Sequence, residues 1–238
     1  MITLIKNAGR VLVLGLCLAG AVQAASMKEV AEAVKAKDFD TAFVQLKELA
    51  ATGDPVAQFL LAMMYENGRG TEKNDEEAFR WYKAAAEQGH ASAQNNLAQF
   101  YLKGKGVKAN PEEAVAWFRK AAEAGNAVAQ YNLGLRYAKG EGVPQDLKQA
   151  FEWYRKAAEQ GNRFALFNVA YAYATGEGVE KNLVEAMKWA LLSADAGFKR
   201  GAQFAAFLKP NLKEEELKQA QEQALAWKQA KSQVAKAK

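Results

Sequence analysis

Small and aromatic side chains return at the same positions of this chain every 36 residues. We call a set of positions that are 36 residues apart a column. The glycine column is Gly53, Gly89, Gly125, Gly161 and Gly197. The tyrosine and tryptophan columns are Tyr65, Tyr101, Tyr137 and Tyr173, and Trp81, Trp117, Trp153 and Trp189. A fixed period between about 20 and 50 residues indicates a repeat architecture. The pattern therefore predicts four complete units, over residues 54–89, 90–125, 126–161 and 162–197.

The apolar spacing within each unit predicts two antiparallel helices. In the third unit, Ala129, Leu133 and Tyr137 recur every four residues and so share one face of a first helix. Gly134 on the same helix allows a neighbouring element to approach closely. Gly140 is expected to end this helix, because glycine adopts the left-handed backbone conformation at low steric cost.

The second helix of each unit is expected to begin at an Asn or Asp. These residues are Asn74, Asn110, Asp146 and Asn182, and they are followed three residues later by Glu77, Glu113, Gln149 and Glu185. The spacing predicts a capping-box-like arrangement at the start of each second helix. Ala150, Trp153 and Ala157 then form the buried stripe of the third unit.

One such helix pair cannot bury both of its apolar faces, so neighbouring units are expected to stack. The predicted fold is therefore all-α, an α/α superhelical solenoid of helix-turn-helix repeats with capping helices at both ends. Residues 25–53 would form the N-terminal cap and residues 198–238 the C-terminal cap. After Gly197 the repeat register is expected to slip by one residue. A final helix from about Lys213 should dock one face on the last repeat.

The first 24 residues have the features of a secretory signal peptide. Lys6 and Arg10 precede an apolar run over residues 11–22, and small residues before the end of the segment predict cleavage after Ala24. The run is too short for the roughly 20 residues that span a bilayer. An uncleaved anchor, or a lipoprotein acylated at Cys17, is the alternative. Cleavage predicts a cysteine-free mature protein in the periplasm or outside the cell, with no membrane insertion.

Composition argues against most catalytic and metal chemistry. With one Cys and one His in the chain, a disulfide scaffold and nearly every Cys/His metal site are excluded. His90 occupies the position at which the other units place Asp or Asn, so a helix-capping role is expected for it. Each unit has a Gly-x-Gly loop, such as Gly140 and Gly142 in the third unit. These loops follow a predicted helix and lack a preceding strand, which favours helix termination over phosphate binding. We therefore predict no catalytic residue, no metal and no cofactor.

The charge of the chain is nearly balanced along most of its length. Residues 25–208 contain 23 basic and 23 acidic side chains, whereas residues 209–238 contain seven Lys and four Glu. Nucleic-acid binding needs a concentrated basic stripe, and it is not predicted here. A solvated amphipathic cap is the favoured interpretation of the C-terminal surplus, with a partner or membrane-surface contact as the alternative.

These units resemble Sel1-like repeats, which are relatives of the tetratricopeptide repeat. The resemblance rests on the Ala-Gln-x-Asn-Leu-Gly core, the Gly-x-Gly-Val loop and the Trp-Tyr-x-Lys-Ala-Ala-Glu-x-Gly tail, and it covers about residues 54–200. Leu60, Thr71 and Ala190 depart from the pattern. The resemblance implies a non-enzymatic adaptor that binds proteins, in bacterial members often exported and tied to the cell envelope or to host contact. The alternative, a cell-wall or β-lactam binding or hydrolysing protein, is suggested by cysteine-rich relatives whose paired cysteines this chain lacks.

In two-helix solenoids the first helices line the concave side, and a binding surface there varies between units while the framework stays fixed. The varying positions predict a groove of aromatic anchors flanked by amides and two Lys, suited to an extended peptide or a helix of a partner protein. The candidate residues are Phe59, Met63, Asn95, Asn96, Gln99, Lys103, Tyr131, Asn132, Leu135, Lys139, Phe167, Asn168 and Tyr171. The alternative for Asn132 and its equivalents is local hydrogen bonding within the repeat.

Overall fold

The computed structural model describes residues 26–236, which form twelve α-helices and one short 3-10 helix and contain no strand. The prediction of an all-α chain is confirmed for this part. The predicted signal peptide, with its cleavage position and Cys17, lies outside the described residues. None of the described helices has the length and apolar character needed to cross a membrane.

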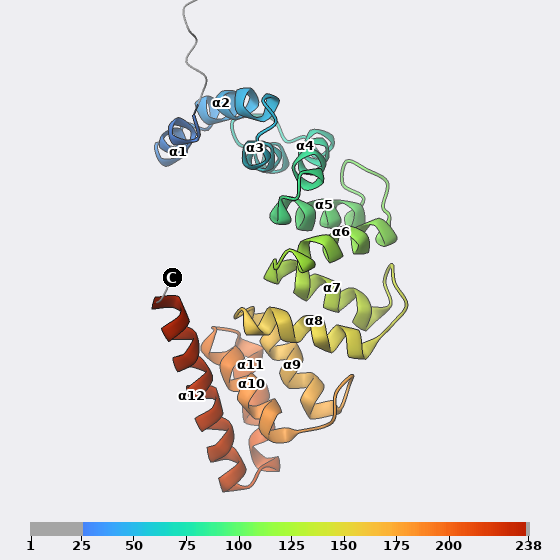
Figure 1. Cartoon of the computed structure of the whole chain (residues 1–238), viewed down its shortest axis with the longest axis vertical. Helices are drawn as coiled ribbons and strands as arrows, with labels where there is room; N and C mark the ends of the chain where they lie inside the picture. The colour runs from blue at the N-terminus through green and yellow to red at the C-terminus, as the bar shows by residue number, and fades with distance from the viewer. Residues whose placement is uncertain (1–25, 237–238) are drawn as a thin grey trace, which may run out of the picture.

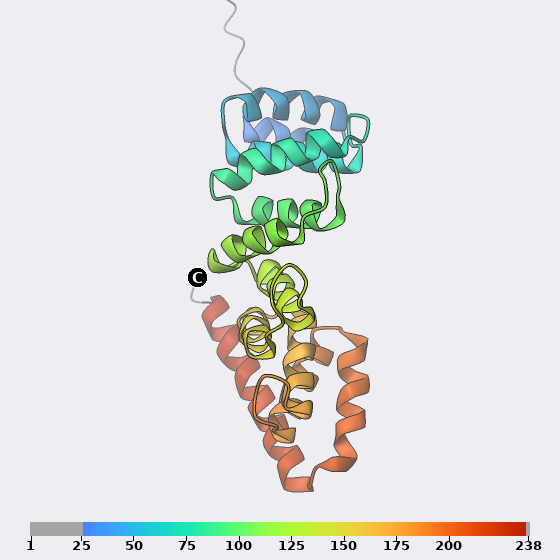
Figure 2. The ribbon, with the colours of Figure 1, turned by 90° about the vertical axis from the view of Figure 1, so that its right-hand side faces the viewer.

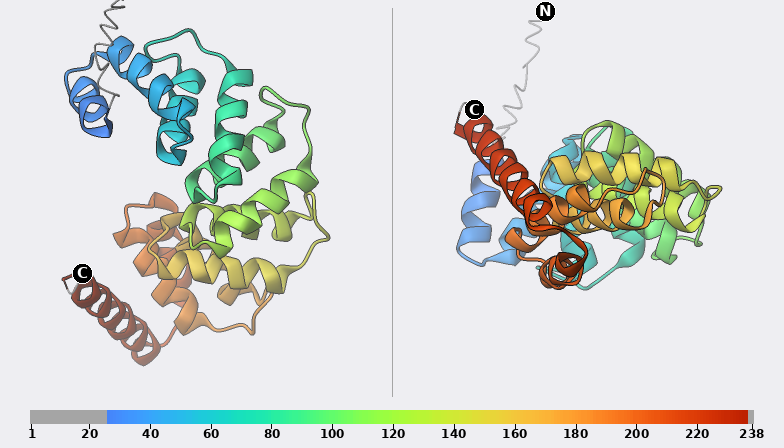
Figure 3. Two further views of the ribbon diagram at one scale, coloured as in Figure 1. Left: turned by 45° about the horizontal axis from the view of Figure 1, so that its top comes forward. Right: turned by 90° about the horizontal axis from the view of Figure 1, so that it is seen from below.

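The helices follow one another in pairs along an arc that is open on one side (Figures 1 and 3). The bounds are α1 (Met27–Lys35), α2 (Phe39–Ala51), α3 (Pro55–Asn67), α4 (Asp75–Glu87), α5 (Ala91–Lys103), α6 (Pro111–Glu123), α7 (Ala127–Lys139), α8 (Leu147–Glu159), α9 (Arg163–Thr175), α10 (Leu183–Asp195), α11 (Lys199–Leu208), η1 (Lys209–Asn211) and α12 (Glu214–Lys236). We call α3, α5, α7, α9 and α11 the first helices, and α4, α6, α8 and α10 the second helices. Successive pairs stack in series from α1 to α10 (Figure 2).

The predicted Asn and Asp caps are present, but the reciprocal half of the predicted capping box is not formed in the second helices. The Asn74 side chain accepts a hydrogen bond from the backbone N–H of Glu77 at 3.0 Å. The Asn74 N–H itself donates to the carbonyl of Tyr65 on the first helix, and the other three units repeat this bond. Because this donor is already used, the Glu77 carboxylate is free to pair with Arg80.

The two glycines of each loop have different roles. Gly140 ends α7 in the left-handed conformation, as predicted. Gly142 has a φ of +74°, and a Cβ atom there would lie 2.3 Å from the backbone oxygen of Pro111, at the start of the second helix of the preceding unit. Gly70, Gly106 and Gly178 make the same approach. The second glycine therefore belongs to the interface between units.

The tryptophan column lies in the core, as predicted. Trp117, Trp153 and Trp189 are between 6% and 9% exposed, and Trp81 is half-buried. A buried apolar cluster continues from α3 through α12, and a smaller cluster lies beneath α1, α2 and α3. The stacked units therefore share one core along the array, as a solenoid requires.

The 36-residue register continues through α11, so the predicted slip after Gly197 is wrong. The first helices begin at residues 55, 91, 127, 163 and 199. Gly201 occupies the buried position of Ala57, Ala93, Ala129 and Ala165, and a Cβ atom there would lie 2.7 Å from the Ser193 hydroxyl oxygen. Earlier units have Ala at the Ser193 position, so the larger Ser is accommodated by a glycine opposite it. Helix α11 is thus the first helix of an incomplete fifth unit.

Helix α12 closes the C-terminal end of the array, as predicted. It packs on α10 and not as the hairpin partner of α11 (Figure 1). Ala220 and Ala224 are buried, and the Trp189 and Trp227 rings meet edge to face with centroids 6.2 Å apart. The opposite side of the helix is exposed to solvent.

Candidate protein-interaction surface

The predicted binding residues all lie on first helices, and we call the surface that these helices form the first-helix face. The structure exposes Met63, Lys103, Lys139 and Tyr171, and half-buries Phe59, Asn96, Gln99, Tyr131, Asn132, Leu135, Phe167 and Asn168. Tyr171 is 43% exposed and Met63 36%. Asn95 is only 8% exposed and lies in the floor of the face.

Amides of two neighbouring first helices, α5 and α7, form a short ladder between their units. The Asn132 side-chain nitrogen donates to the Asn95 oxygen at 3.0 Å, and the Asn95 nitrogen donates to the Asn96 oxygen at 3.2 Å. The hydrogen bond of Asn132 thus crosses to the neighbouring repeat, and it is not the bond within one repeat that was the alternative interpretation. Such a ladder holds the spacing of adjacent first helices.

Two buried phenols lie behind this ladder. Burial and a hydrogen bond to Glu66 raise the pKa of Tyr82, while Asn96 opposes the rise by hydrogen bonding to the same phenol. Burial likewise raises the pKa of Tyr154. Both phenols therefore stay protonated at neutral pH and act as fixed hydrogen-bonding groups. The Tyr82 hydroxyl donates to Glu66 at 2.8 Å, and Lys105 of the next unit donates to the same carboxylate.

A continuous chain of aromatic rings crosses the C-terminal half of the face. The ring contacts run from Tyr131 to Phe164 (centroids 5.8 Å apart), Phe164 to Phe198 (5.1 Å), Phe198 to Phe167 (5.5 Å), Phe167 to Phe204 (5.5 Å) and Tyr171 to Phe204 (6.1 Å). Three helices, α7, α9 and α11, therefore contribute to one aromatic surface. At its edge Phe207 stacks on Phe204 and is 69% exposed.

The repeat pattern in the sequence did not predict the contribution of α11 to this surface. Phe204 and Phe207 stand 36 residues after the candidates Asn168 and Tyr171, so an uninterrupted register would have included them. Phe198 stands in the capping column, and α11 accordingly begins without a side-chain cap. The Phe198 ring instead packs edge to face against the rings of Phe164 and Phe167.

Two arginines cover rings of the aromatic surface. The Arg163 guanidinium lies 4.8 Å from the Phe164 ring centroid, and the Arg200 guanidinium lies 4.8 Å from that of Phe167. Burial raises the pKa of Tyr131, and the nearby positive charge of Arg200 opposes the rise. A surface depression of about 230 Å³ lies here, lined by Phe167, Arg200, Gln203, Phe204 and Phe207.

The N-terminal end of the face has a second apolar depression and the single histidine. The depression has a volume of about 220 Å³ and is lined by residues that include Val34, Leu60 and Met63. His90 caps α5, since its Nδ1 accepts from the Ala93 N–H at 3.1 Å, and its ring stacks on Phe59 with centroids 4.6 Å apart. The capping role predicted for His90 is confirmed. Burial lowers its pKa.

Within residues 26–236 no group of three or more His, Cys, Asp or Glu side chains is placed to hold a metal ion. The first helices carry amides, phenols, cations and one carboxylate, that of Glu66. The arrangement is suited to binding a polypeptide through apolar side chains and hydrogen bonds.

Comparison with known proteins agrees with this geometry. The family model described as Sel1 repeat matches residues 55–90, 91–126, 127–162 and 163–198. A Sel1 repeat protein from Oxalobacter formigenes is 39% identical, with a TM-score of 0.72 over 76% of this chain and 74% of its own. The protein c5321, a protective antigen of uropathogenic Escherichia coli strains with an SLR fold, is 34% identical, with a TM-score of 0.73 over 83% of this chain and 44% of its own. Among curated proteins no match is found.

Proposed function

The chain belongs to the Sel1 repeat family, and from that premise we propose that it is an exported, non-enzymatic scaffold that binds a peptide or a helix of a partner protein on its first-helix face. The Sel1 fold is a protein-interaction scaffold, and members of the family are in general non-catalytic. The E. coli relative is a protective antigen, which supports a role in the cell envelope or in host contact.

The observation that carries this proposal is the aromatic surface across α7, α9 and α11. Phe207 and Tyr171 expose large rings, and each lines a surface depression of its own, Phe207 with Phe204 and Tyr171 with Asn168. Aromatic side chains with fixed positions are the usual anchors of protein interfaces, because they bury much area at a low cost in side-chain entropy.

Site-specific photocrosslinking in intact cells tests the proposal. A photoreactive amino acid placed at Tyr171 should capture a discrete protein partner, identified by mass spectrometry. Val44 on α2 is the matched control, because it is apolar and 56% exposed but lies outside the first helices. Adducts of equal yield and identity at Tyr171 and Val44, or no adduct at Tyr171, would contradict binding on this face.

A second variant separates binding from folding. Tyr131→Ala introduced into the Tyr171 photoprobe protein should reduce the adduct, because it removes one ring of the aromatic surface. The far-UV circular dichroism of the variant should remain that of a folded helical protein, since Tyr131 is only half-buried. Loss of the adduct together with loss of helicity would mean that the ring serves the fold.

Export is tested by the mass of the protein recovered from cells. Cleavage after Ala24 predicts that the periplasmic or secreted fraction contains a chain beginning at Ala25. Intact-mass spectrometry of that fraction distinguishes it from a lipid-modified chain and from an uncleaved one. Recovery of only the full-length chain would refute the proposed processing.

A further inference from the structure

Charge is segregated between the two sets of helices. The first helices α5, α7, α9 and α11 contain no Asp or Glu at all. Their cationic residues are Lys103, Arg136, Lys139, Arg163, Lys199 and Arg200. The second helices α4, α6, α8 and α10 carry eleven acidic and eight basic side chains. From α5 to α11 the first helices of this nearly neutral array are therefore purely cationic, whereas α3 carries Glu66 and no basic residue.

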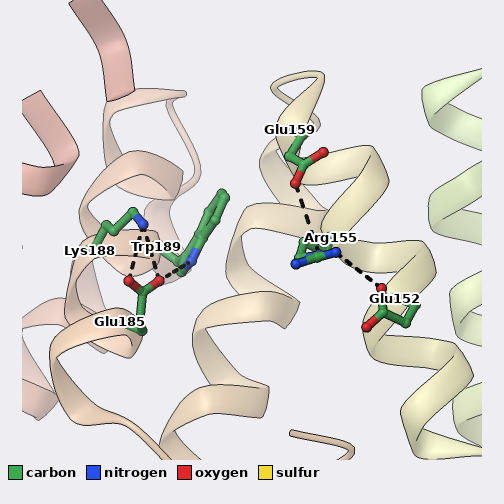
Figure 4. Close-up of polar contacts among 6 residues, drawn as sticks. All are labelled: Glu152, Arg155, Glu159, Glu185, Lys188 and Trp189. Carbon is green, nitrogen blue, oxygen red and sulfur yellow. Dashed lines mark hydrogen bonds and ion pairs between the residues drawn. The ribbon is translucent and has the colours of Figure 1, made fainter. Parts of the chain in front are cut away.

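Several carboxylates of the second helices pair with cations of their own helix. Arg155 lies between Glu152 at 3.4 Å and Glu159 at 4.0 Å, and Glu185 accepts from Lys188 at 3.1 Å (Figure 4).

On the first helices, Arg136 and Lys139 share the loop carboxylate of Glu141. The remaining four cations, Lys103, Arg163, Lys199 and Arg200, are exposed, and over residues 26–236 none of them has a carboxylate within 4.0 Å. The positive charge at this face is therefore not compensated by the protein itself.

The two arginines are held ready for an anionic group. When a guanidinium lies over an aromatic ring, its N–H donors still point outward in the guanidinium plane. They can therefore donate two hydrogen bonds to one carboxylate. Arg200 lines the same depression as Phe204 and Phe207. A ligand that fills this depression with an apolar side chain would thus bring its neighbouring groups within reach of the Arg200 guanidinium.

We propose that the partner segment is an acidic peptide in which an aromatic or aliphatic side chain is flanked by Asp or Glu, and that it seats on α9 and α11 with its apolar side chain in the Phe204 depression and its carboxylates on Arg163 and Arg200. This inference rests on the proposed function and specifies the chemistry of its partner. Charge complementarity carries it, since α9 and α11 contain Arg163, Lys199 and Arg200 and no carboxylate, which favours anionic segments and repels basic ones.

A polypeptide is favoured over a nucleic acid, the other common polyanion. Single-stranded nucleic acids bind by stacking bases on free ring faces. Here Phe164 and Phe167 each have one face covered by an arginine, and their contacts with Phe198 are edge to face, at interplanar angles of 75° and 80°. The depression beside them admits a side chain.

Selection from a random peptide library tests this inference. Phage-displayed random dodecapeptides are selected on the immobilised protein, and the composition of the bound pool is compared with the input pool. Enrichment of Asp or Glu next to aromatic or aliphatic residues is the expected result. A bound pool without an acidic preference would overturn the inference while leaving peptide binding intact. Failure to enrich any peptide would count against both the inference and the proposed function.

The arginines are tested with the most enriched peptide, labelled with fluorescein and followed by anisotropy. Arg163→Gln combined with Arg200→Gln should weaken its binding roughly tenfold, as expected for the loss of two exposed ion pairs. The matched control is Arg80→Gln combined with Arg155→Gln, which removes the same charge from the second helices α4 and α8. Equal affinities of the two double variants would overturn the inference. So would tighter binding of a labelled oligothymidylate than of the peptide.

Discussion

Replacing Gly142 by alanine tests whether the loops hold adjacent units together. The φ of +74° at Gly142 places alanine in the left-handed region, which costs a non-glycine residue about 1 to 2 kcal/mol. The new Cβ atom would also lie 2.3 Å from the Pro111 oxygen. Carbon and oxygen atoms normally stay more than about 3.3 Å apart. The loop and the start of α6 must therefore separate by about 1 Å.

The structure supplies a matched control in the same unit. Gly161 has a φ of +86°, but a Cβ atom there meets no atom within 4 Å. Gly161→Ala thus carries the conformational cost alone, about 1 to 2 kcal/mol. Gly142→Ala adds the cost of overpacking, typically about 1 to 3 kcal/mol. The expected loss is about 2 to 5 kcal/mol for Gly142→Ala.

Urea unfolding followed by far-UV circular dichroism measures the difference between the two variants. With a slope of about 1 to 3 kcal/mol per molar urea, an extra 2 kcal/mol lowers the midpoint by roughly 1 M. Equal midpoints for Gly142→Ala and Gly161→Ala would refute the assigned interface role. A second pair, Gly106→Ala and Gly125→Ala, repeats the comparison one unit earlier in the array, with a Cβ-to-oxygen approach of 2.2 Å at Gly106.

Three further predictions concern single side chains. Trp153→Ala should lower the free energy of unfolding by about 3 to 5 kcal/mol, because it empties a core position; a melting curve unchanged by it would show that the tryptophan is dispensable. Gln130→Leu should cost about 1 to 3 kcal/mol, because it breaks two hydrogen bonds, the one that Gln130 donates to the Ala122 carbonyl and the one that its side-chain oxygen accepts from Gln160, and thermal unfolding checks this. Burial lowers the pKa of folded His90 below its ordinary 6.5, so its stabilising contribution is complete above that value and is lost as the pH falls through the folded pKa. The difference in melting temperature between about pH 7 and pH 5 should therefore be larger for the natural protein than for His90→Asn, and equal differences would contradict the burial of a neutral imidazole.

The elements of the fold could be predicted because their signals are local and repeated. The cap of a second helix requires only Asn74 and the residues after it, and the end of a first helix requires only a glycine. Contacts between units were harder to predict. Gly142 touches a backbone atom 31 positions earlier, and nothing in the composition of its loop identifies that partner.

The aromatic surface could be predicted only in part. Tyr131, Phe167 and Tyr171 stand at positions where the residue type differs from one unit to the next, and they were predicted to bind a partner for that reason. The α11 rings were missed because the Ala202-Gln203 pair suggested a shifted register, whereas the buried position is filled by Gly201. A glycine in an alanine column has no side chain to mark its place, so only the packing against Ser193 reveals it.

The cationic character of the first helices was hidden from any count made along the chain. First and second helices alternate about every 20 residues, so a window longer than one unit averages first helices that contain no carboxylate from α5 onward against second helices that are rich in them. Residues 25–208 balance for this reason, and the linear count places the whole basic surplus at the C-terminus. A partner does not meet that average, because charges interact over about 8 to 10 Å at physiological salt. The charge that matters for binding is that of the face that contacts the partner. In a solenoid this charge is the sum over the successive first helices.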